Sequence, residues 1–431
     1  MELTDFDCNQ FIAILQEELI PALGCTEPIA IAYAGAHARA LLGKIPDRVC
    51  IKSSGNIIKN VKSVTVPNSG NMKGIPAAAA IGIIGGNPDK GLEVLADITE
   101  ADIARTKKFL EKVPCKVSLL DTVASLHFIV EVFADADSAS VEIIHQHTNV
   151  VRTTKNGKEV LSVPFDPASA NAALTDRSGL SVKKILEFAD TIDLDRVRPI
   201  LERQIDYNTR IAQEGLEHRY GINAGANLLK AAEAEQAVTL KIRAQAAAAA
   251  GSDARMSGCT LPVVTNSGSG NQGLTASLPV IVFAEEKKLP HDQLLRGLLV
   301  SNLIAIHQKT RIGRLSAYCG AVSAGCGSGA AVTYLSGGSY EQVCETITNT
   351  LAVVSGIVCD GAKPSCASKI ASSVDAALNA HYLAMQNRVF WPGDGIVKGD
   401  IEKTIAGVGA IAADGMRETD KVILRIMVDD D

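Results

Sequence analysis

The residues most able to do chemistry are ten cysteines, and four of them form two evenly spaced pairs. Cys319 and Cys326 are separated by six residues, and so are Cys359 and Cys366. Both pairs lie in glycine-rich sequence, which lets a chain wrap closely around a bound group and point backbone amides at sulfur atoms. The pattern predicts metal ligands, catalytic thiols or cysteines buried as small hydrophobic residues.

Three kinds of site compete for these cysteines on spacing alone. A structural zinc site usually has C-x2-C spacing, so the six-residue gaps argue against it. Buried core thiols are common in helices rich in alanine and glycine. An iron–sulfur cluster matches neither common ferredoxin spacing, but Gly361 and Pro364 should bend the loop from Cys359 to Cys366 so that both thiols meet. Cys366 also precedes a predicted helix, whose N-terminus would favour a thiolate and an anionic cluster.

Another cysteine, Cys25, lies in Gly-Cys-Thr-Glu-Pro at residues 24–28, where we expect a helix to begin. Thr26 would cap this helix and Pro28 would fit its first turn. The helix N-terminus should lower the pKa of Cys25, so its thiolate is a candidate general base, with a buried inert thiol as the alternative. Glu27 is a second candidate base, although a first-turn glutamate is more often only favourable to the helix dipole.

The tripeptide Ser-Gly-Asn occurs three times and provides candidate turns for binding a substrate. Glycine-rich turns present backbone amides that can hold a carboxylate, and ordinary tight turns are the alternative at the first two sites. Residues 268–273 also fit the dinucleotide fingerprint, but Pro279 follows where the required helix should run, so we discount it. The candidates are Ser54, Gly55, Asn56, Ser69, Gly70, Asn71, Ser269, Gly270 and Asn271.

Basic and histidine residues near these motifs give weaker indications of a binding site. One of Lys309, Arg311 and Arg314 could neutralise a substrate carboxylate, but a basic helix end is the more frequent role. His145 and His147 lie two apart on a predicted strand and would share one face. We interpret both histidines as surface or packing residues.

The elements that must position these residues follow from composition. Of 431 residues, 47% are hydrophobic but only 4% are aromatic, so alanine-rich helices should build much of the core. A net charge of −6 without a long basic run predicts no nucleic-acid partner. No stretch reaches the roughly 18 apolar residues that span a bilayer, and the N-terminus has no signal core. We therefore expect a cytoplasmic protein without a membrane partner, whose cysteines are not a disulfide framework.

Periodicity predicts an α+β fold, with an α+β N-terminal part (1–170) and a mainly helical C-terminal part (171–431). The first part should contain helices at 5–20, 28–42 and near 75–112, strands at 48–53 and 61–66, and a β region near 114–162 with a hairpin turning at Asn156-Gly157. The second should contain helices at 183–191, 194–218, 224–250, 291–309, 339–356, 367–387 and 398–412, and extended pieces at 261–265 and 278–283.

Four motifs together resemble the L-cysteine desulfidases, which are relatives of the iron–sulfur L-serine dehydratase alpha chain. They are Gly24-Cys25-Thr26-Glu27-Pro28, Asn266-Ser-Gly-Ser-Gly-Asn-Gln-Gly273, Ala317-Tyr-Cys319-Gly320 and Cys359-Asp-Gly-Ala-Lys-Pro-Ser-Cys366. The resemblance covers nearly the whole chain, and the four motifs occur in the same order as in the family. It implies that Cys319, Cys359 and Cys366 hold a 4Fe-4S cluster and that Cys25 accepts the α-proton. Cys326 and Cys344 fall outside the motifs and should be packing residues.

The resemblance implies a lyase that converts L-cysteine to sulfide, ammonia and pyruvate. Three ligands for four irons would leave one iron open, and this iron would hold the departing sulfur as a Lewis acid. No pyridoxal phosphate is expected, because the chain shows no phosphate-cradling motif with a Schiff-base lysine. L-serine dehydration by the same mechanism is the alternative, and a non-enzymatic iron–sulfur sensor or scaffold is a second one. The expected partner is a small amino acid; mainly helical metabolic enzymes are often homodimers.

Overall fold

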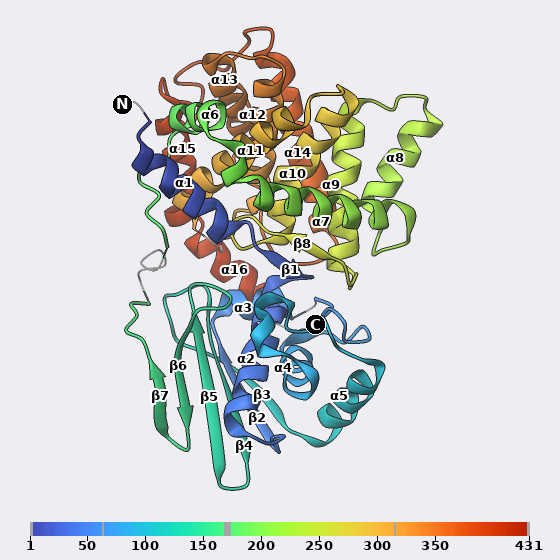
Figure 1. Ribbon diagram of the computed structural model, residues 1–431, viewed down its shortest axis with the longest axis vertical. Helices are drawn as coiled ribbons and strands as arrows, with labels where there is room; N and C mark the ends of the chain where they lie inside the picture. Colours follow the sequence, from blue (N-terminus) through green and yellow to red (C-terminus); the bar gives the residue numbers. More distant parts are fainter. Residues whose placement is uncertain (1–2, 63, 168–173, 314–315, 429–431) are drawn as a thin grey trace.

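A computed structural model describes residues 3–62, 64–167, 174–313 and 316–428 and shows two parts stacked along the long axis (Figure 1). The sheet part, residues 26–167, holds a six-stranded sheet and its covering helices. The helical part consists of the N-terminal helix and residues 174–428. The predicted α+β class is confirmed. The division predicted at residue 170 stays a prediction, because it falls within 168–173, outside the described residues.

The sheet has the strand order β3-β2-β4-β5-β6-β7, with β2 and β3 parallel and the other neighbours antiparallel. Along β4, Phe128, Val130 and Val132 are buried in one core cluster, the alternation expected when helices cover one face. Helices α2 and α4 pack on this sheet. The elements of this part are α2 (Thr26–Leu42), β2 (Arg48–Ser53), α3 (Gly55–Val61), α4 (Gly74–Gly85), η1 (Pro88–Glu93), α5 (Glu100–Lys112), β3 (Cys115–Leu119), β4 (His127–Ala134), β5 (Asp137–Ile144), β6 (Val150–Lys155) and β7 (Lys158–Ser162).

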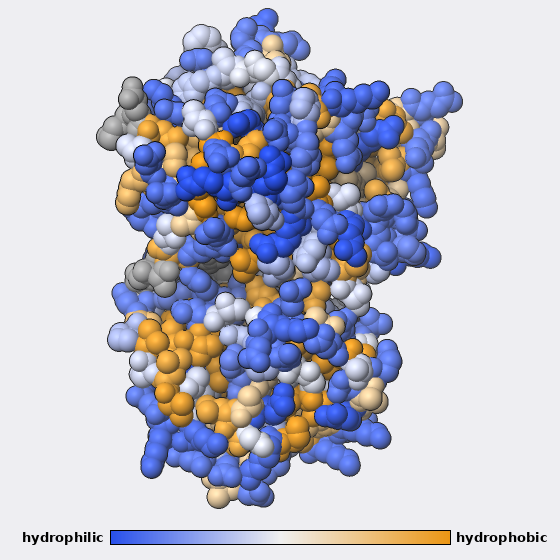
Figure 2. Space-filling model, viewed as in Figure 1, coloured by the Kyte–Doolittle hydropathy of each residue, from blue (hydrophilic) through white to orange (hydrophobic). Residues whose placement is uncertain are grey.

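Most sequence predictions for the sheet part are confirmed. Strand β2 has the predicted bounds, and the hairpin of β6 and β7 turns at Asn156 and Gly157, both with positive φ. The strand predicted at 61–66 is wrong, because helix α3 extends to Val61 and only an isolated bridge between Thr65 and Lys73 follows among the described residues. A short apolar run cannot distinguish a strand from a helix by its period. Edge strand β7 is exposed along its length, and Figure 2 shows hydrophobic residues gathered on this side of the sheet part.

The helical part is built around one large cluster of aliphatic side chains, with Phe11 and Phe188 packed edge to face at 5.4 Å. None of the helices in the described ranges is both long and apolar enough to cross a bilayer. The elements are α1 (Asp5–Glu18), α6 (Val182–Thr191), η2 (Leu194–Arg196), α7 (Arg198–Glu217), α8 (Ala224–Ala234), α9 (Leu240–Met256), α10 (Gly270–Glu286), α11 (His291–Ile312), α12 (Gly320–Leu335), α13 (Tyr340–Val353), α14 (Cys366–Ala384), α15 (Ile401–Ala410), η3 (Ile411–Gly415) and α16 (Arg417–Val428).

Helices α10 and α12 were not predicted. Pro279 lies inside α10, where we expected an extended piece at 278–283. A proline in a helix interior costs about 3 kcal/mol, but nearly every residue of α10 from Gly270 to Ala284 is buried, so packing outweighs this cost. Helix α12 is rich in glycine, which has low helix propensity, and it too is stabilised by burial. The helix predicted at 224–250 is two helices, α8 and α9.

Two joints connect the parts. Strand β1 (Pro21–Leu23) pairs antiparallel with β8 (Pro262–Val264), which confirms the extended piece predicted at 261–265. Near the other end of the chain, α16 packs on α3, where Lys59 forms an ion pair with Asp420. The segment after the N-terminal helix and the C-terminal helix therefore both contact parts of the chain that are distant in sequence.

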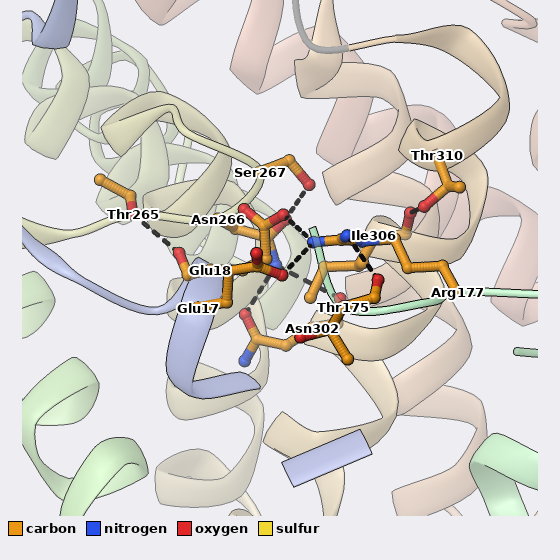
Figure 3. A network of polar contacts seen from close by, with 10 residues as sticks. All are labelled: Glu17, Glu18, Thr175, Arg177, Thr265, Asn266, Ser267, Asn302, Ile306 and Thr310. Carbon is orange, nitrogen blue, oxygen red and sulfur yellow. Dashed lines mark hydrogen bonds and ion pairs between the residues drawn. The ribbon is translucent and has the colours of Figure 1, made fainter. Parts of the chain in front are cut away.

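A polar network lies beside the β1–β8 joint (Figure 3). The buried guanidinium of Arg177 donates to Glu17 at 2.7 Å and to Glu18 at 2.5 Å. The hydroxyl of Thr265 donates to the backbone carbonyl of Glu18 at 2.8 Å. These contacts hold the C-terminal end of α1 against Arg177 and against Thr265, the residue after β8.

Replacing Arg177 with Met should lower the free energy of unfolding by about 3 kcal/mol, because it removes the guanidinium from its ion pair with the buried Glu18 carboxylate. Urea denaturation under anaerobic conditions measures this change. The matched control is Arg198→Met, which removes a solvent-exposed ion pair with Asp292 and should change stability little. Equal effects of the two substitutions would contradict the structural role assigned to Arg177.

Candidate active site

One buried pocket between the two parts collects the first turns of four helices. Cys25 precedes α2, Ser269 precedes α10, Cys319 precedes α12, and Cys366 begins α14. All four residues line the pocket. Because the first amides of a helix have no partner within the helix, each N-terminus carries partial positive charge. Each N-terminus therefore favours an anion bound in the pocket.

Short backbone pairing brings two of the predicted cluster ligands together. Residues 317–319 and 357–359 run antiparallel, and the amides of Cys319 and Cys359 donate to carbonyls of the opposite segment at 2.8 and 2.7 Å. The side chains of Cys319 and Cys359 hydrogen-bond to each other, and both lie near Cys366. All three predicted cluster cysteines are thus on one side of the pocket.

The Cys319–Cys359 contact separates the pKa values of the two thiols. The thiol of Cys319 donates to Cys359 and lowers the pKa of Cys359 to about 6, although burial opposes this. The same contact, followed by burial, raises the pKa of Cys319 well above its usual value. The amide of Gly361 and the nearby charges of Lys59 and Lys309 also lower the pKa of Cys359. At neutral pH the pair therefore holds one thiolate and one thiol.

These residues fit the cluster that the sequence predicts. Within the described residues, no three His, Cys, Asp or Glu side chains converge on a single metal ion. A cluster binds each cysteine through a different iron, so its ligands stand around it instead of converging on one point. Gly361 makes the loop possible, because its φ is +93° and a Cβ there would lie 2.6 Å from the carbonyl oxygen of Lys59.

Cys25 faces the same pocket as a protonated thiol. It is buried, and its Sγ donates to Glu27 Oε2 at 3.1 Å. Burial, followed by the charge of Glu27, raises the pKa of Cys25 well above its usual value. The predicted depression by the helix N-terminus is therefore wrong, because desolvation and a neighbouring carboxylate outweigh it. The predicted cap is also wrong: Cys25 itself is the N-cap residue, and α2 begins at Thr26.

Glu27 is the ionised partner of Cys25. Its carboxylate accepts hydrogen bonds from Cys25, from the Thr26 hydroxyl at 3.1 Å and from Asn60 Nδ2 at 3.0 Å. Burial is the largest influence and would raise the pKa of Glu27, but His147, the Cys25 thiol and other neighbours together lower it. A carboxylate held in this way can take the proton that the Cys25 thiol must lose to become a base.

The loop before α10 is tied to both parts. The Thr26 hydroxyl shares its single proton between Glu27 and the carbonyl of Gly268, whose oxygen also lies 3.1 Å away. The Ser267 hydroxyl donates to Asn266 Oδ1 at 2.9 Å, and Asn266 donates in turn to Asn302 on α11 (Figure 3). These bonds hold the loop that carries Ser267, Gly268 and Ser269 into the pocket.

The three Ser-Gly-Asn tripeptides have different positions. The turns predicted at the first and third are wrong, because Ser54 and Ser269 precede helices α3 and α10. Ser269 and Asn271 line the pocket, and Gly270 lies between them at the start of α10. Asn56 also lines it, whereas Ser54 and Gly55 line a neighbouring pocket beside α16. Ser69, Gly70 and Asn71 do not line the pocket, and the hydroxyl of Ser69 donates to its own turn.

Only some of the basic and histidine candidates line the pocket. Lys309 lines the pocket, Arg311 does not, and Arg314 is outside the described residues. The interpretation of His147 as a surface or packing residue is wrong, because it lines the pocket near Glu27. His145 Nε2 donates to the backbone carbonyl of Asp166 instead. Both histidines follow β5 and do not lie on it.

Several pocket residues were missed from the sequence. Asn60, Arg255 and Gln272 line the pocket together with the predicted residues. Gln272 lies within the motif at 266–273, so the motif was a usable signal for it. Arg255 lies in the last turn of an alanine-rich helix with no motif around it. Cys326 and Cys344, expected to be packing residues, pack in the helical core away from the pocket.

Comparison with known proteins shows the family of this chain. The profile of the serine dehydratase alpha chain family matches residues 89–425. The chain belongs to this family. It also belongs with proteins named UPF0597 protein: one from Treponema denticola is 56% identical over 100% of both chains, and one from Lachnoclostridium phytofermentans is 54% identical over 97% of this chain and 99% of the relative. The matched range contains the three predicted cluster cysteines, whereas Cys25 precedes it.

Replacing Glu27 with Gln should lower the pKa of Cys25, because the negative charge of Glu27 is one cause of its elevation. The measurement is ultraviolet thiolate absorbance across pH, taken as the difference from the same protein carrying Cys25→Ser. Glu142→Gln is the matched control, since Glu142 is also a buried carboxylate but bonds to His127 away from the pocket. An unchanged or higher Cys25 pKa in Glu27→Gln would rule out the pairing.

Proposed function

We propose that this protein is an L-cysteine desulfidase that releases sulfide, ammonia and pyruvate with a 4Fe-4S cluster held by Cys319, Cys359 and Cys366. The observation that carries the proposal is the common pocket of these three thiols and the Cys25–Glu27 pair. The family supports an elimination reaction of a small amino acid. When bound, the cluster would supply a Lewis-acidic iron that binds the substrate sulfur and makes sulfide a better leaving group.

The residues of the chain supply the proton transfers. The Cys25 sulfur takes the α-proton of the substrate in the same step in which its own proton passes to Glu27, so no free Cys25 thiolate forms. The electron pair of the broken Cα–H bond forms the new carbon–carbon double bond as the carbon–sulfur bond breaks. The proton on Glu27 completes the leaving sulfide, which restores the carboxylate and leaves Cys25 protonated. The aminoacrylate product tautomerises to an imine, which water hydrolyses to pyruvate and ammonia.

L-serine dehydration is the second candidate, and the name of the matching family favours it. The same base would remove the α-proton, and hydroxide would leave in place of sulfide. The soft sulfur of L-cysteine suits iron better than the hydroxyl of L-serine does. A non-enzymatic sensor or scaffold would have no use for a Cys25–Glu27 proton pair.

We also propose that the protein works in the reducing cytoplasm. All ten cysteines are present as free thiols in the described structure. A cluster held by thiolates in a pocket needs these thiols reduced, and thiols stay reduced in that compartment.

The activity test is the release of sulfide and pyruvate from L-cysteine by protein reconstituted with iron and sulfide without oxygen. Cys25→Ala should lower turnover by about 10²–10⁴-fold, the usual contribution of a general base, while the visible absorbance of the cluster persists. The control is Cys344→Ala, which changes a thiol in the helical core outside the pocket. Full turnover by Cys25→Ala would reject Cys25 as the base.

L-serine assayed in parallel with the wild-type protein decides between the two substrates. The proposal predicts a higher kcat/KM for L-cysteine, because iron prefers the thiolate leaving group. Pyruvate formation from L-serine alone would place the protein with the dehydratases. A loaded cluster without turnover of either amino acid would sink both candidates.

A further inference from the structure

Arg255 is a buried cation in the pocket that forms no hydrogen bond or ion pair with the other described residues. It lies in the last turn of α9, is 3% exposed, and lines the pocket. Its Nε has no hydrogen-bond partner. Burying a charge is costly unless it is paired and hydrogen-bonded. An anionic ligand in the pocket would supply the missing partner.

The other cations of the pocket are already engaged. Lys59 forms an ion pair with Asp420 on α16, and Lys309 also interacts with another group. Arg255 therefore differs from both lysines, because its guanidinium has no hydrogen-bond acceptor among the described residues. A guanidinium is the side chain best suited to hold a planar carboxylate by two parallel hydrogen bonds.

The surroundings of Arg255 suit one particular anion. A Cβ on Gly270 would lie 2.3 Å from Nε of Arg255, so the guanidinium is packed against the N-terminus of α10. Ser269 caps this helix without a side-chain bond, which leaves its first amides available. Asn271 Oδ1 and Gln272 Oε1 in the same turn have no hydrogen-bond partner. Donors for a carboxylate and acceptors for an ammonium thus lie side by side.

The position of Arg255 also connects the two halves of the site. Its charge acts on Cys25, Glu27 and Cys366, which all line the same pocket. A small molecule bound to Arg255 would consequently share this pocket with the proton pair and the cluster cysteines.

We propose that Arg255 and the first turn of α10 bind the α-carboxylate of the substrate, while Asn271 and Gln272 receive its α-ammonium group. Arg255 is then a specificity-determining residue that selects small α-amino acids with a free carboxylate. The assignment deepens the proposed function and rests on it for the reaction that follows binding. The binding step itself does not depend on which group leaves.

L-alanine is the probe, because it has the carboxylate and the ammonium group but no leaving group. Isothermal titration calorimetry on cluster-free protein without oxygen should show binding of L-alanine and much weaker binding of ethylamine, which lacks the carboxylate. Arg255→Met should weaken L-alanine binding at least about tenfold, or about 1.4 kcal/mol. Arg243→Met, on the exposed side of the same helix, should leave it unchanged.

Gly270→Ala is a second variant, because its methyl group would displace the guanidinium without removing its charge. It should weaken L-alanine binding as well, and thermal unfolding of each variant checks that it is folded. Wild-type protein that binds L-alanine no better than ethylamine overturns the proposal, as does folded Arg255→Met with unchanged affinity. Loss of the cluster from Arg255→Met with normal L-alanine binding would assign the arginine to the cluster instead.

The same measurements separate this inference from the reaction. Cluster-loaded wild-type protein that turns over neither L-cysteine nor L-serine, together with Arg255-dependent binding of L-alanine, would refute the proposed function and leave the carboxylate site standing. Turnover of L-cysteine at wild-type KM by Arg255→Met would leave the desulfidase standing and refute the carboxylate site.

Discussion

Four helices begin at the walls of one buried pocket, and the charged groups of the site depend on this arrangement. Thiolates and carboxylates are costly to bury, and helix N-termini offset that cost with fixed dipoles that need no side chain. Neighbouring groups add to this effect. His147 and the Cys25 thiol keep Glu27 ionised despite its burial, and the Cys319 thiol lowers the pKa of Cys359 to about 6. The same field would favour an anionic cluster and a substrate carboxylate. The field in the pocket therefore depends on the relative positions of the four helices.

The two parts of the protein each contribute half of the chemistry. Helix α2 of the sheet part carries Cys25 and Glu27, and helices α12 and α14 of the helical part carry Cys319 and Cys366. The β1–β8 joint, the network around Arg177 and the packing of α16 on α3 hold the parts together beside the pocket. These joints keep the Cys25–Glu27 pair and the three proposed cluster cysteines in one pocket.

Local patterns predicted much of the fold, and packing decided the rest. Strand β2 and the turn at Asn156-Gly157 follow from β-branched residues and turn chemistry, which act locally. Helix α10 was missed because Pro279 is unfavourable locally and is tolerated only through burial. The site cysteines lie in compact motifs and could be found, whereas Arg255 stands alone in α9 and reaches the pocket only through the tertiary fold. The pKa of Cys25 was predicted with the wrong sign because its burial cannot be seen in the sequence.

The central claim is that Cys319, Cys359 and Cys366, and no other cysteines, hold the cluster. The most direct measurement is cysteine alkylation followed by mass spectrometry, comparing cluster-free and anaerobically reconstituted protein. The account predicts that reconstitution protects these three thiols from alkylation and leaves half-buried Cys8 and Cys344 as reactive as before. A protein with the visible absorbance of a cluster in which any of the three remains as reactive as in the cluster-free form would contradict the account.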